Sequence, residues 1–123
     1  MKDCVFCNIP KERILFETSD CIAMFDAYPV SKGHTLLISK KHYKTYFDLP
    51  EILRPSMDYW LRHIKDILDE KYRPDGYNVG FNCGESAGQT IDHFHIHIIP
   101  RYKGDVENPR GGVRGVIPSK QNY

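Results

Sequence analysis

Three histidines alternate with three apolar residues between His93 and Ile98, in the order His-Phe-His-Ile-His-Ile. Side chains alternate between the two faces of a β-strand, so this pattern predicts a strand with one histidine face and one apolar face. The apolar face can pack against a second layer of structure. The histidine face carries a cost, because neighbouring half-buried imidazoles must be hydrogen-bonded, bound to a metal or used in chemistry. The segment therefore constrains both the fold and the function.

The rest of the sequence predicts a sheet covered by one helix. Strands are predicted at Ile14–Thr18, Cys21–Asp26, His34–Ser39, Tyr77–Asn82 and His93–Ile99, the last ended by Pro100. Apolar residues at three- and four-residue steps predict one long helix over Pro55–Arg73. Short links between neighbouring strands favour antiparallel pairing. We therefore expect an α+β fold, an antiparallel sheet of about five strands with one long helix packed on it.

Length and composition limit the number of domains and the kinds of partner that the chain can have. A chain of 123 residues fits a single domain over residues 1–123. From Lys103 onward the sequence contains four glycines and two prolines, so residues 103–123 are expected to form an irregular tail over the surface. The formal net charge of +1 gives no basic field for nucleic acid, and no nucleic-acid partner is expected.

The sequence also predicts a location. No apolar stretch is long enough to cross a membrane, and the residues after Met1 lack the apolar run of a secretion signal. We therefore expect a cytoplasmic protein with no membrane partner. Thiols stay reduced in the cytosol, so the four cysteines are expected as ligands or core residues rather than as disulfides.

The residues alone leave three interpretations of the histidine strand. The histidines are surface residues, or they hold a catalytic metal through an H-x-H pair, or one of them is a nucleophile toward phosphorus. A neutral imidazole can approach an anionic phosphate and leaves readily once phosphorylated. The preceding loop, residues 82–90, is rich in small residues and neutral donors that let backbone N–H groups approach phosphate oxygens. The loop favours the third interpretation.

These motifs resemble those of the HIT family, the histidine-triad nucleotide hydrolases and transferases. The triad is complete from His93 to Ile99, and Gly88-Gln89-Thr90 is similar to the family's step before it. Upstream, Asp26, Pro29 and the segment from Gly33 to Leu36 are similar to the family's nucleoside-side loop and strand. The resemblance runs from about Cys4 to Arg101 and implies the HIT-like form of the expected fold.

The resemblance also implies roles for individual residues. His95 would attack the α-phosphorus and form a nucleotidyl-histidine intermediate, and His97 would hydrogen-bond a phosphate oxygen and help protonate the leaving group. The other implied substrate contacts are Asp26 to the ribose hydroxyls, His34 as an orienting residue, Asn82 near the ribose or phosphate, and Gln89 and Thr90 to phosphate oxygens.

A zinc site is a further implication. Cys4 and Cys7 form a C-x-x-C pair, which is also compatible with free thiols or a reversible disulfide. In the HIT subset that carries this N-terminal pair, the remaining ligands correspond to His42 and His93, which gives a Cys₂His₂ structural zinc site. Zinc there would leave His95 and His97 free for chemistry, and this argues against one catalytic metal shared by all three histidines.

The resemblance narrows the substrate to small nucleotides. We expect hydrolysis of diadenosine or other dinucleoside polyphosphates, with a purine nucleoside phosphoramidase or a nucleotide-binding regulatory protein with little turnover as alternatives. The base would stack on apolar side chains, with Phe6, Ile9, Met24 and Ala27 as candidates. Cations at Arg101, Lys103, Arg110 and Arg114 could hold outer phosphates or belong to a solvated tail. A homodimer that extends the sheet is also expected, with Tyr59, Trp60 and His63 of the helix as candidate contacts.

Overall fold

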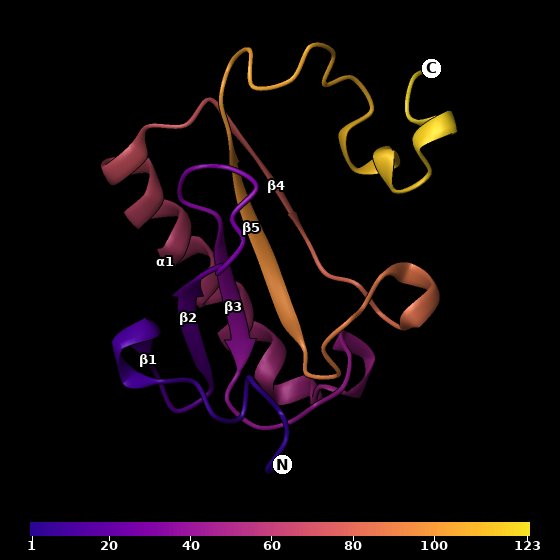
Figure 1. Ribbon diagram of the computed structural model, residues 1–123. Helices are drawn as coiled ribbons and strands as arrows, with labels where there is room; N and C mark the ends of the chain where they lie inside the picture. Colours follow the sequence, from indigo (N-terminus) through magenta and orange to yellow (C-terminus); the bar gives the residue numbers. More distant parts are fainter.

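The computed structural model describes all 123 residues. Its strands are β1 (Ile14–Glu17), β2 (Cys21–Phe25), β3 (Thr35–Ser39), β4 (Gly76–Gly80) and β5 (His95–Arg101), and its α-helix is α1 (Arg54–Tyr72) (Figure 1). Short 3₁₀ helices lie at Lys11–Arg13, Tyr46–Asp48, Glu51–Leu53, Glu85–Ala87, Gly112–Val116 and Pro118–Lys120. No helix combines the length and apolar character needed to cross a membrane.

The strands form one sheet in the order β1-β2-β3-β5-β4, and every neighbouring pair is antiparallel. This architecture confirms the predicted α+β fold. β5 is the last strand in the sequence, yet it lies inside the sheet between β3 and β4. A strand in that position is lined by neighbours on both sides, which gives its side chains fixed surroundings.

Helix α1 crosses one face of the sheet (Figure 1) and buries its apolar stripe there. Met57, Ile64 and Leu68 are buried on this stripe, at the spacing that places side chains on one side of a helix. They share a core cluster with Leu37 of β3 and Ile98 of β5. The cluster also contains Phe94, which lies immediately before β5. The apolar half of the alternating segment therefore faces the helix, as predicted.

The opposite face of the sheet carries the histidines and a second, smaller core. Leu36 of β3 pairs with His97 of β5, and Ile38 pairs with His95. Leu36 and Ile38 are buried with Phe6 and Met24, so residues near the amino terminus cover part of this face. The histidines of β5 thus stand beside an apolar patch rather than in open solvent.

The predicted limits of β5 were wrong at both ends. His93 and Phe94 precede the strand, which begins at His95 and runs through Pro100 to Arg101. The carbonyl of Pro100 accepts a hydrogen bond from the Ser31 hydroxyl at 2.6 Å. In an antiparallel strand the N–H and C=O of one residue point to the same side, so the nitrogen of Pro100 also faces away from β4. The missing N–H of proline therefore removes no hydrogen bond between β4 and β5. Other strand limits differ from the predictions by one or two residues.

Residues 103–123 fold back on themselves beyond β4 (Figure 1). The guanidinium of Arg114 donates to the carbonyls of Lys120 and Gln121 at 2.7 and 3.3 Å. Arg110 and Arg114 both lie over the ring of Tyr123, each 4.7 Å from its centre. These contacts occupy two of the four cations that the sequence offered as ligands for outer phosphates, Arg110 and Arg114.

Gly33 sets the entry into β3 and leads to a stability prediction. Its φ is +92°, and an added Cβ would lie 2.8 Å from Cδ2 of Tyr72 and 3.2 Å from Cγ of Pro100. Gly33→Ala should therefore lower the free energy of unfolding by about 1–3 kcal/mol, measured by urea denaturation. The control is Gly76→Ala, where a Cβ meets nothing within 4 Å. Equal stabilities of the two variants would contradict this account of the turn.

Candidate functional site

His95 has one ring nitrogen tied to the backbone and one free. Its Nδ1 lies 2.8 Å from the carbonyl oxygen of His93. A carbonyl only accepts, so Nδ1 carries the proton and the neutral ring has its lone pair on Nε2. The ring of Phe6 packs edge-on against His95 with centres 4.9 Å apart. This arrangement presents a fixed nucleophilic nitrogen on the histidine face of the sheet.

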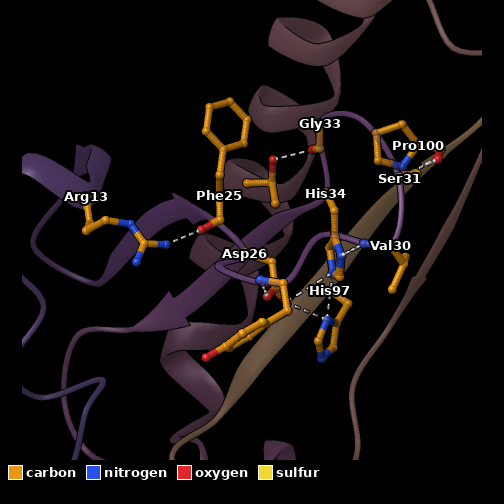
Figure 2. A network of polar contacts seen from close by, with 11 residues as sticks. Arg13, Phe25, Asp26, Val30, Ser31, Gly33, His34, His97 and Pro100 are labelled. Carbon is orange, nitrogen blue, oxygen red and sulfur yellow. Dashed lines mark hydrogen bonds and ion pairs between the residues drawn. The ribbon is translucent and has the colours of Figure 1, made fainter.

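His97 belongs to a network with two residues from neighbouring strands (Figure 2). Its Nδ1 lies 2.9 Å from Nε2 of His34, the residue before β3. The carboxylate oxygen Oδ2 of Asp26, the residue after β2, lies 3.4 Å from Nε2 of His34 and 3.9 Å from Nδ1 of His97. Because β2, β3 and β5 are side by side, their ends bring these three side chains together.

The backbone N–H of Val30 closes the network from the other side. It donates to Nδ1 of His34 at 3.1 Å (Figure 2). Nδ1 must therefore be unprotonated, which places the single proton of neutral His34 on Nε2. A metal ion bound by Asp26, His34 and His97 would need that Nε2 lone pair. The hydrogen bond from Val30 thus argues against a metal site in this cluster.

Both histidines of this network favour the neutral state. Burial, together with the nearby His95 and His34, lowers the pKa of His97 to about 4, and the Asp26 carboxylate opposes this shift. Burial also lowers the pKa of His34, which is only 3% exposed, although the Asp26 carboxylate opposes the shift. At neutral pH both rings are therefore uncharged hydrogen-bonding groups.

A pocket of about 330 Å³ opens beside this network. Its polar side chains are those of His34, Asn78, Asn82 and His97, while Ile99, Val113 and other apolar residues supply most of the remaining wall. A mainly apolar pocket with a few fixed polar groups is the usual form of a small-molecule site. Asn82, selected from the sequence, thus lines the same pocket as His97.

A larger pocket of about 700 Å³ lies between the tail and the ends of β4 and β5. It contains no histidine or cysteine, and its Arg101 makes a two-pronged contact with Asp105 at 2.8 and 2.9 Å. The same guanidinium donates to Asn78 at 2.6 Å. These bonds occupy Arg101, so it is not free to bind a ligand in the larger pocket. The smaller pocket beside His97 is therefore the better candidate for the functional site.

Gln89 and Thr90 are placed differently from each other. Gln89 is 7% exposed, and its side-chain amide donates to the carbonyls of Lys44 and Ile91 and accepts from the N–H of Gly84. Those three bonds hold the loop before β5, so Gln89 reaches a phosphate only by breaking one of them. Thr90 is exposed and its hydroxyl makes no hydrogen bond within the chain.

Of the four residues expected to bind the base, three lie in or against the small core on the histidine face and one is exposed. Phe6 and Met24 are buried in the small core on the histidine face, and Ile9 packs against that core. Ala27 is exposed at the start of the following loop. These side chains form an apolar surface next to His95 rather than an open slot.

The four predicted metal ligands meet in one place. Cys4, Cys7, His42 and His93 bring their ligand atoms within 4.8 Å of one another. Sγ of Cys4 lies 3.3 Å from Nδ1 of His93, and Sγ of Cys7 lies 3.3 Å from Nδ1 of His42. His93 donates from Nε2 to the carbonyl of Ser39 at 2.7 Å, so its Nδ1 lone pair faces the cysteines.

This donor set fits zinc. In a tetrahedral site with Zn–S near 2.3 Å and Zn–N near 2.0 Å, a sulfur and a nitrogen lie about 3.5 Å apart. The separations of 3.3 and 3.5 Å from Cys7 to His42 and His93 agree with that value. Burial raises the pKa of the Cys7 thiol, and its hydrogen bond and charge interaction with Cys4 raise it further. A divalent cation would relieve this repulsion between adjacent sulfurs.

Sequence reasoning selected the side chains of the site but missed the backbone groups that set their protonation. The Val30 N–H and the carbonyls of Ser39 and His93 carry no residue-specific signal.

The sequence matches the HIT domain family over residues 8–104. An adenylylsulfatase of Arabidopsis thaliana is 37% identical over 107 residues, which cover 84% of this chain and 54% of that protein. A bis(5'-adenosyl)-triphosphatase of Dictyostelium discoideum is 36% identical over 102 residues, or 81% of this chain and 67% of that protein.

Two further similarities bear on the site. An adenosine 5'-monophosphoramidase of Saccharomyces cerevisiae is 38% identical over 103 residues, which cover 80% of this chain and 62% of that protein. The crystal structure of a Zn-bound histidine triad family protein from Mycobacterium smegmatis superposes with a TM-score of 0.75 at 34% identity. The alignment covers 85% of this chain and 78% of that protein.

The depressed pKa of His97 predicts how stability depends on pH. The ordinary pKa of a histidine is 6.5, and the pKa of His97 in the folded chain is about 4. Between these two pH values the unfolded chain binds a proton at His97 that the folded chain does not. Stability should therefore fall as the pH drops through this window, with His97 contributing a slope of up to about 1.4 kcal/mol per pH unit.

His97→Gln removes this contribution, so its free energy of unfolding should fall less steeply with acid than that of the wild type. Urea denaturation at several pH values measures the difference. Val79→Ala, in the same pocket but without a titratable group, is the control and should keep the wild-type slope. If the free energy of unfolding depended on pH equally in His97→Gln and in the wild type, His97 would not be the group with the lowered pKa.

Proposed function

The chain belongs to the HIT domain family, and we propose that it is a nucleotide hydrolase or nucleotidyl transferase that attacks an α-phosphorus with His95. The observation that carries the proposal is the hydrogen bond from Nδ1 of His95 to the carbonyl of His93. It leaves the lone pair of Nε2 free and fixed in direction, which is what a nucleophile toward phosphorus requires.

The surrounding residues support this chemistry. His97 and Asn82 line the adjacent pocket and would donate to phosphate oxygens, where negative charge increases in the transition state. Thr90, with a free hydroxyl on the preceding loop, would hold another oxygen. Asp26 would accept from ribose hydroxyls through the lone pairs that the Tyr28 N–H and His34 leave unused. Gln89 would shape the loop and contact phosphate after rearrangement.

Dinucleoside polyphosphates, diadenosine polyphosphates above all, are the substrates we propose. The triphosphatase relative, by its name, acts on a bis-adenosyl compound. The site offers one apolar surface, around Phe6 and Met24, and one separate pocket beside His97. Two such places, one against His95 and one beside His97, suit a substrate with a nucleoside at each end of its phosphates.

Two alternatives have specific support. The monophosphoramidase relative makes hydrolysis of a nucleoside phosphoramidate the second candidate. A nucleotide-binding regulatory protein with little turnover is the third, and the intact middle histidine weighs against it. A substrate panel separates the first two, and the absence of turnover with any nucleotide would favour the third.

Zinc would be the structural cofactor of this protein. Cys4, Cys7, His42 and His93 would hold it, and it would supply a crosslink between the N-terminal segment and the sheet. The proposal is supported by the donor geometry and by the Zn-bound relative of known structure. Reduced thiols are needed for this role, which suits the cytoplasmic location expected from the sequence.

A homodimer is also part of the proposal. β4 is an edge strand, and the exposed Val79 on it borders an apolar groove with Leu61 of α1 and Tyr77. A second copy that paired along β4 would satisfy its unpaired backbone groups and cover this groove. Trp60 and His63 pack instead toward Phe16 of β1, on the other side of α1.

The nucleophile is tested with His95→Ala. Because no other group replaces its Nε2, release of nucleoside monophosphate from diadenosine tri- and tetraphosphate should fall by at least about a thousandfold. Acid-quenched wild-type protein should carry a nucleotidyl group on His95, detected by mass spectrometry of peptides. His63→Ala, which removes an exposed histidine of α1, is the matched control and should retain activity. Equal turnover by His95→Ala and the wild type would sink the mechanism.

The zinc site is tested by metal content and stability. Protein purified without chelators should contain one zinc per chain, and the double variant Cys4→Ser, Cys7→Ser should contain none. Loss of the metal should lower the unfolding temperature by about 10 °C or more, because binding energy is then lost from the folded state alone. Cys83→Ser, outside the cluster, is the control. A wild-type protein with only traces of zinc would refute the proposal.

A further inference from the structure

The position of the proton on His97 follows from a chain of hydrogen bonds that starts at the backbone. The N–H of Val30 can only donate, so Nδ1 of His34 accepts and Nε2 of His34 carries a proton. That Nε2–H points at Nδ1 of His97 over 2.9 Å (Figure 2). Nδ1 of His97 is therefore an acceptor, and the proton of His97 lies on Nε2.

Protonating His97 a second time would break this chain. A proton on Nδ1 of His97 would face the Nε2–H of His34, and His34 cannot turn its own proton to Nδ1 because the Val30 N–H occupies that side. Oδ2 of Asp26 lies 3.9 Å from Nδ1 of His97, beyond hydrogen-bond distance, while Oδ1 accepts from the N–H of Tyr28 at 2.8 Å. His34 is 3% exposed, so water cannot replace His97 as the acceptor of the His34 Nε2–H.

Removal of the proton from His97 is also unfavourable. A neutral imidazole that gave up its Nε2 proton would become an imidazolate, which needs a strong base or a metal to form. No cationic side chain makes a hydrogen bond or an ion pair with His97. His97 is thus built to donate a hydrogen bond and to keep its proton.

We propose that Val30 and His34 lock His97 as a neutral hydrogen-bond donor, so that the leaving group departs without receiving a proton from the enzyme. This inference rests on the proposed function and replaces the expectation that His97 helps to protonate the leaving group. It predicts selectivity for substrates whose leaving group is a stable anion, such as a nucleoside polyphosphate or a sulfate. Amines and alkoxides, which need a proton to leave, would be poor leaving groups.

The chemical step balances on these terms. The lone pair on Nε2 of His95 forms the N–P bond, the bond from phosphorus to the leaving oxygen breaks, and its electron pair departs with the anion. In the nucleotidyl-imidazolium, Nδ1 of His95 keeps its proton and donates it in a hydrogen bond to the carbonyl of His93. Water then attacks phosphorus, the N–P electron pair returns to Nε2, and the proton of the water passes to the solvent. His97 donates to a phosphate oxygen throughout.

Leaving-group dependence provides the test. Zinc-loaded protein is assayed with a series of aryl esters of adenosine 5'-monophosphate, diadenosine tetraphosphate and an adenosine phosphoramidate of an aliphatic amine. For kcat/KM, which reports steps up to departure of the first product, we expect about a tenfold loss per unit rise in leaving-group pKa across the esters. A flat dependence, or a phosphoramidate turned over as fast as the tetraphosphate, would overturn the inference.

Two variants at one position separate the lock from a merely structural role. His34→Gln keeps an N–H that can reach Nδ1 of His97 and should retain the steep dependence. His34→Leu removes the donor, so His97 can be protonated on both nitrogens, and the dependence should flatten by about tenfold between the extremes of the series. In ¹⁵N-detected NMR, the wild type and His34→Gln should show His97 protonated on Nε2 alone. The same slope in all three proteins would overturn the inference.

The outcomes distinguish this inference from the proposed function. A nucleotidyl-His95 intermediate together with a flat leaving-group dependence leaves the proposed function standing and removes the lock. Absence of any intermediate or turnover removes both. A His97 proton found on Nδ1 in the NMR spectrum contradicts the lock whatever the activity.

Discussion

Backbone groups decide where the protons of four histidines lie, and the rest of the site depends on this constraint. The Val30 N–H acts on His34, and through it on His97, while the carbonyls of Ser39 and His93 act on His93 and His95. Backbone donors and acceptors do not titrate near neutral pH, so they hold tautomers more firmly than ionisable side chains do. In the proposed function, identical side chains would thereby serve as a metal ligand, a nucleophile and a hydrogen-bond donor.

His93 joins the two halves of the site. Its ring faces the cysteines through Nδ1 and Ser39 through Nε2, and it is fully buried. Its carbonyl, in turn, holds His95. Any change in the cluster of Cys4, Cys7 and His42 that moved His93 would reach His95 through the hydrogen bond from its ring to the His93 carbonyl. A structural metal in this place would thus set the precision of the reaction without touching substrate.

Much of the fold could be predicted because local patterns agree with tertiary packing. The stripe of Met57, Ile64 and Leu68 and the alternation around Ile96 both identify buried faces. The start of β5 and the passage of the strand through Pro100 could not be predicted, because they depend on where β3 ends and on a contact from Ser31. The site was predicted as a set of side chains, while their hydrogen bonds to backbone depend on turns that alternation does not encode.

The position of β5 has a consequence for how the chain acquires its structure. Until β5 is synthesised, β1 to β3 form a meander with no partner beyond β3, and β4 has none at all. The apolar stripe of α1 meanwhile lacks Phe94, Ile96 and Ile98. The contacts that complete the core therefore join residues distant in sequence, and closing such loops is slow. On the ribosome, part of the apolar stripe of α1 therefore stays uncovered until β5 is synthesised, and a chaperone could bind this stripe during that interval.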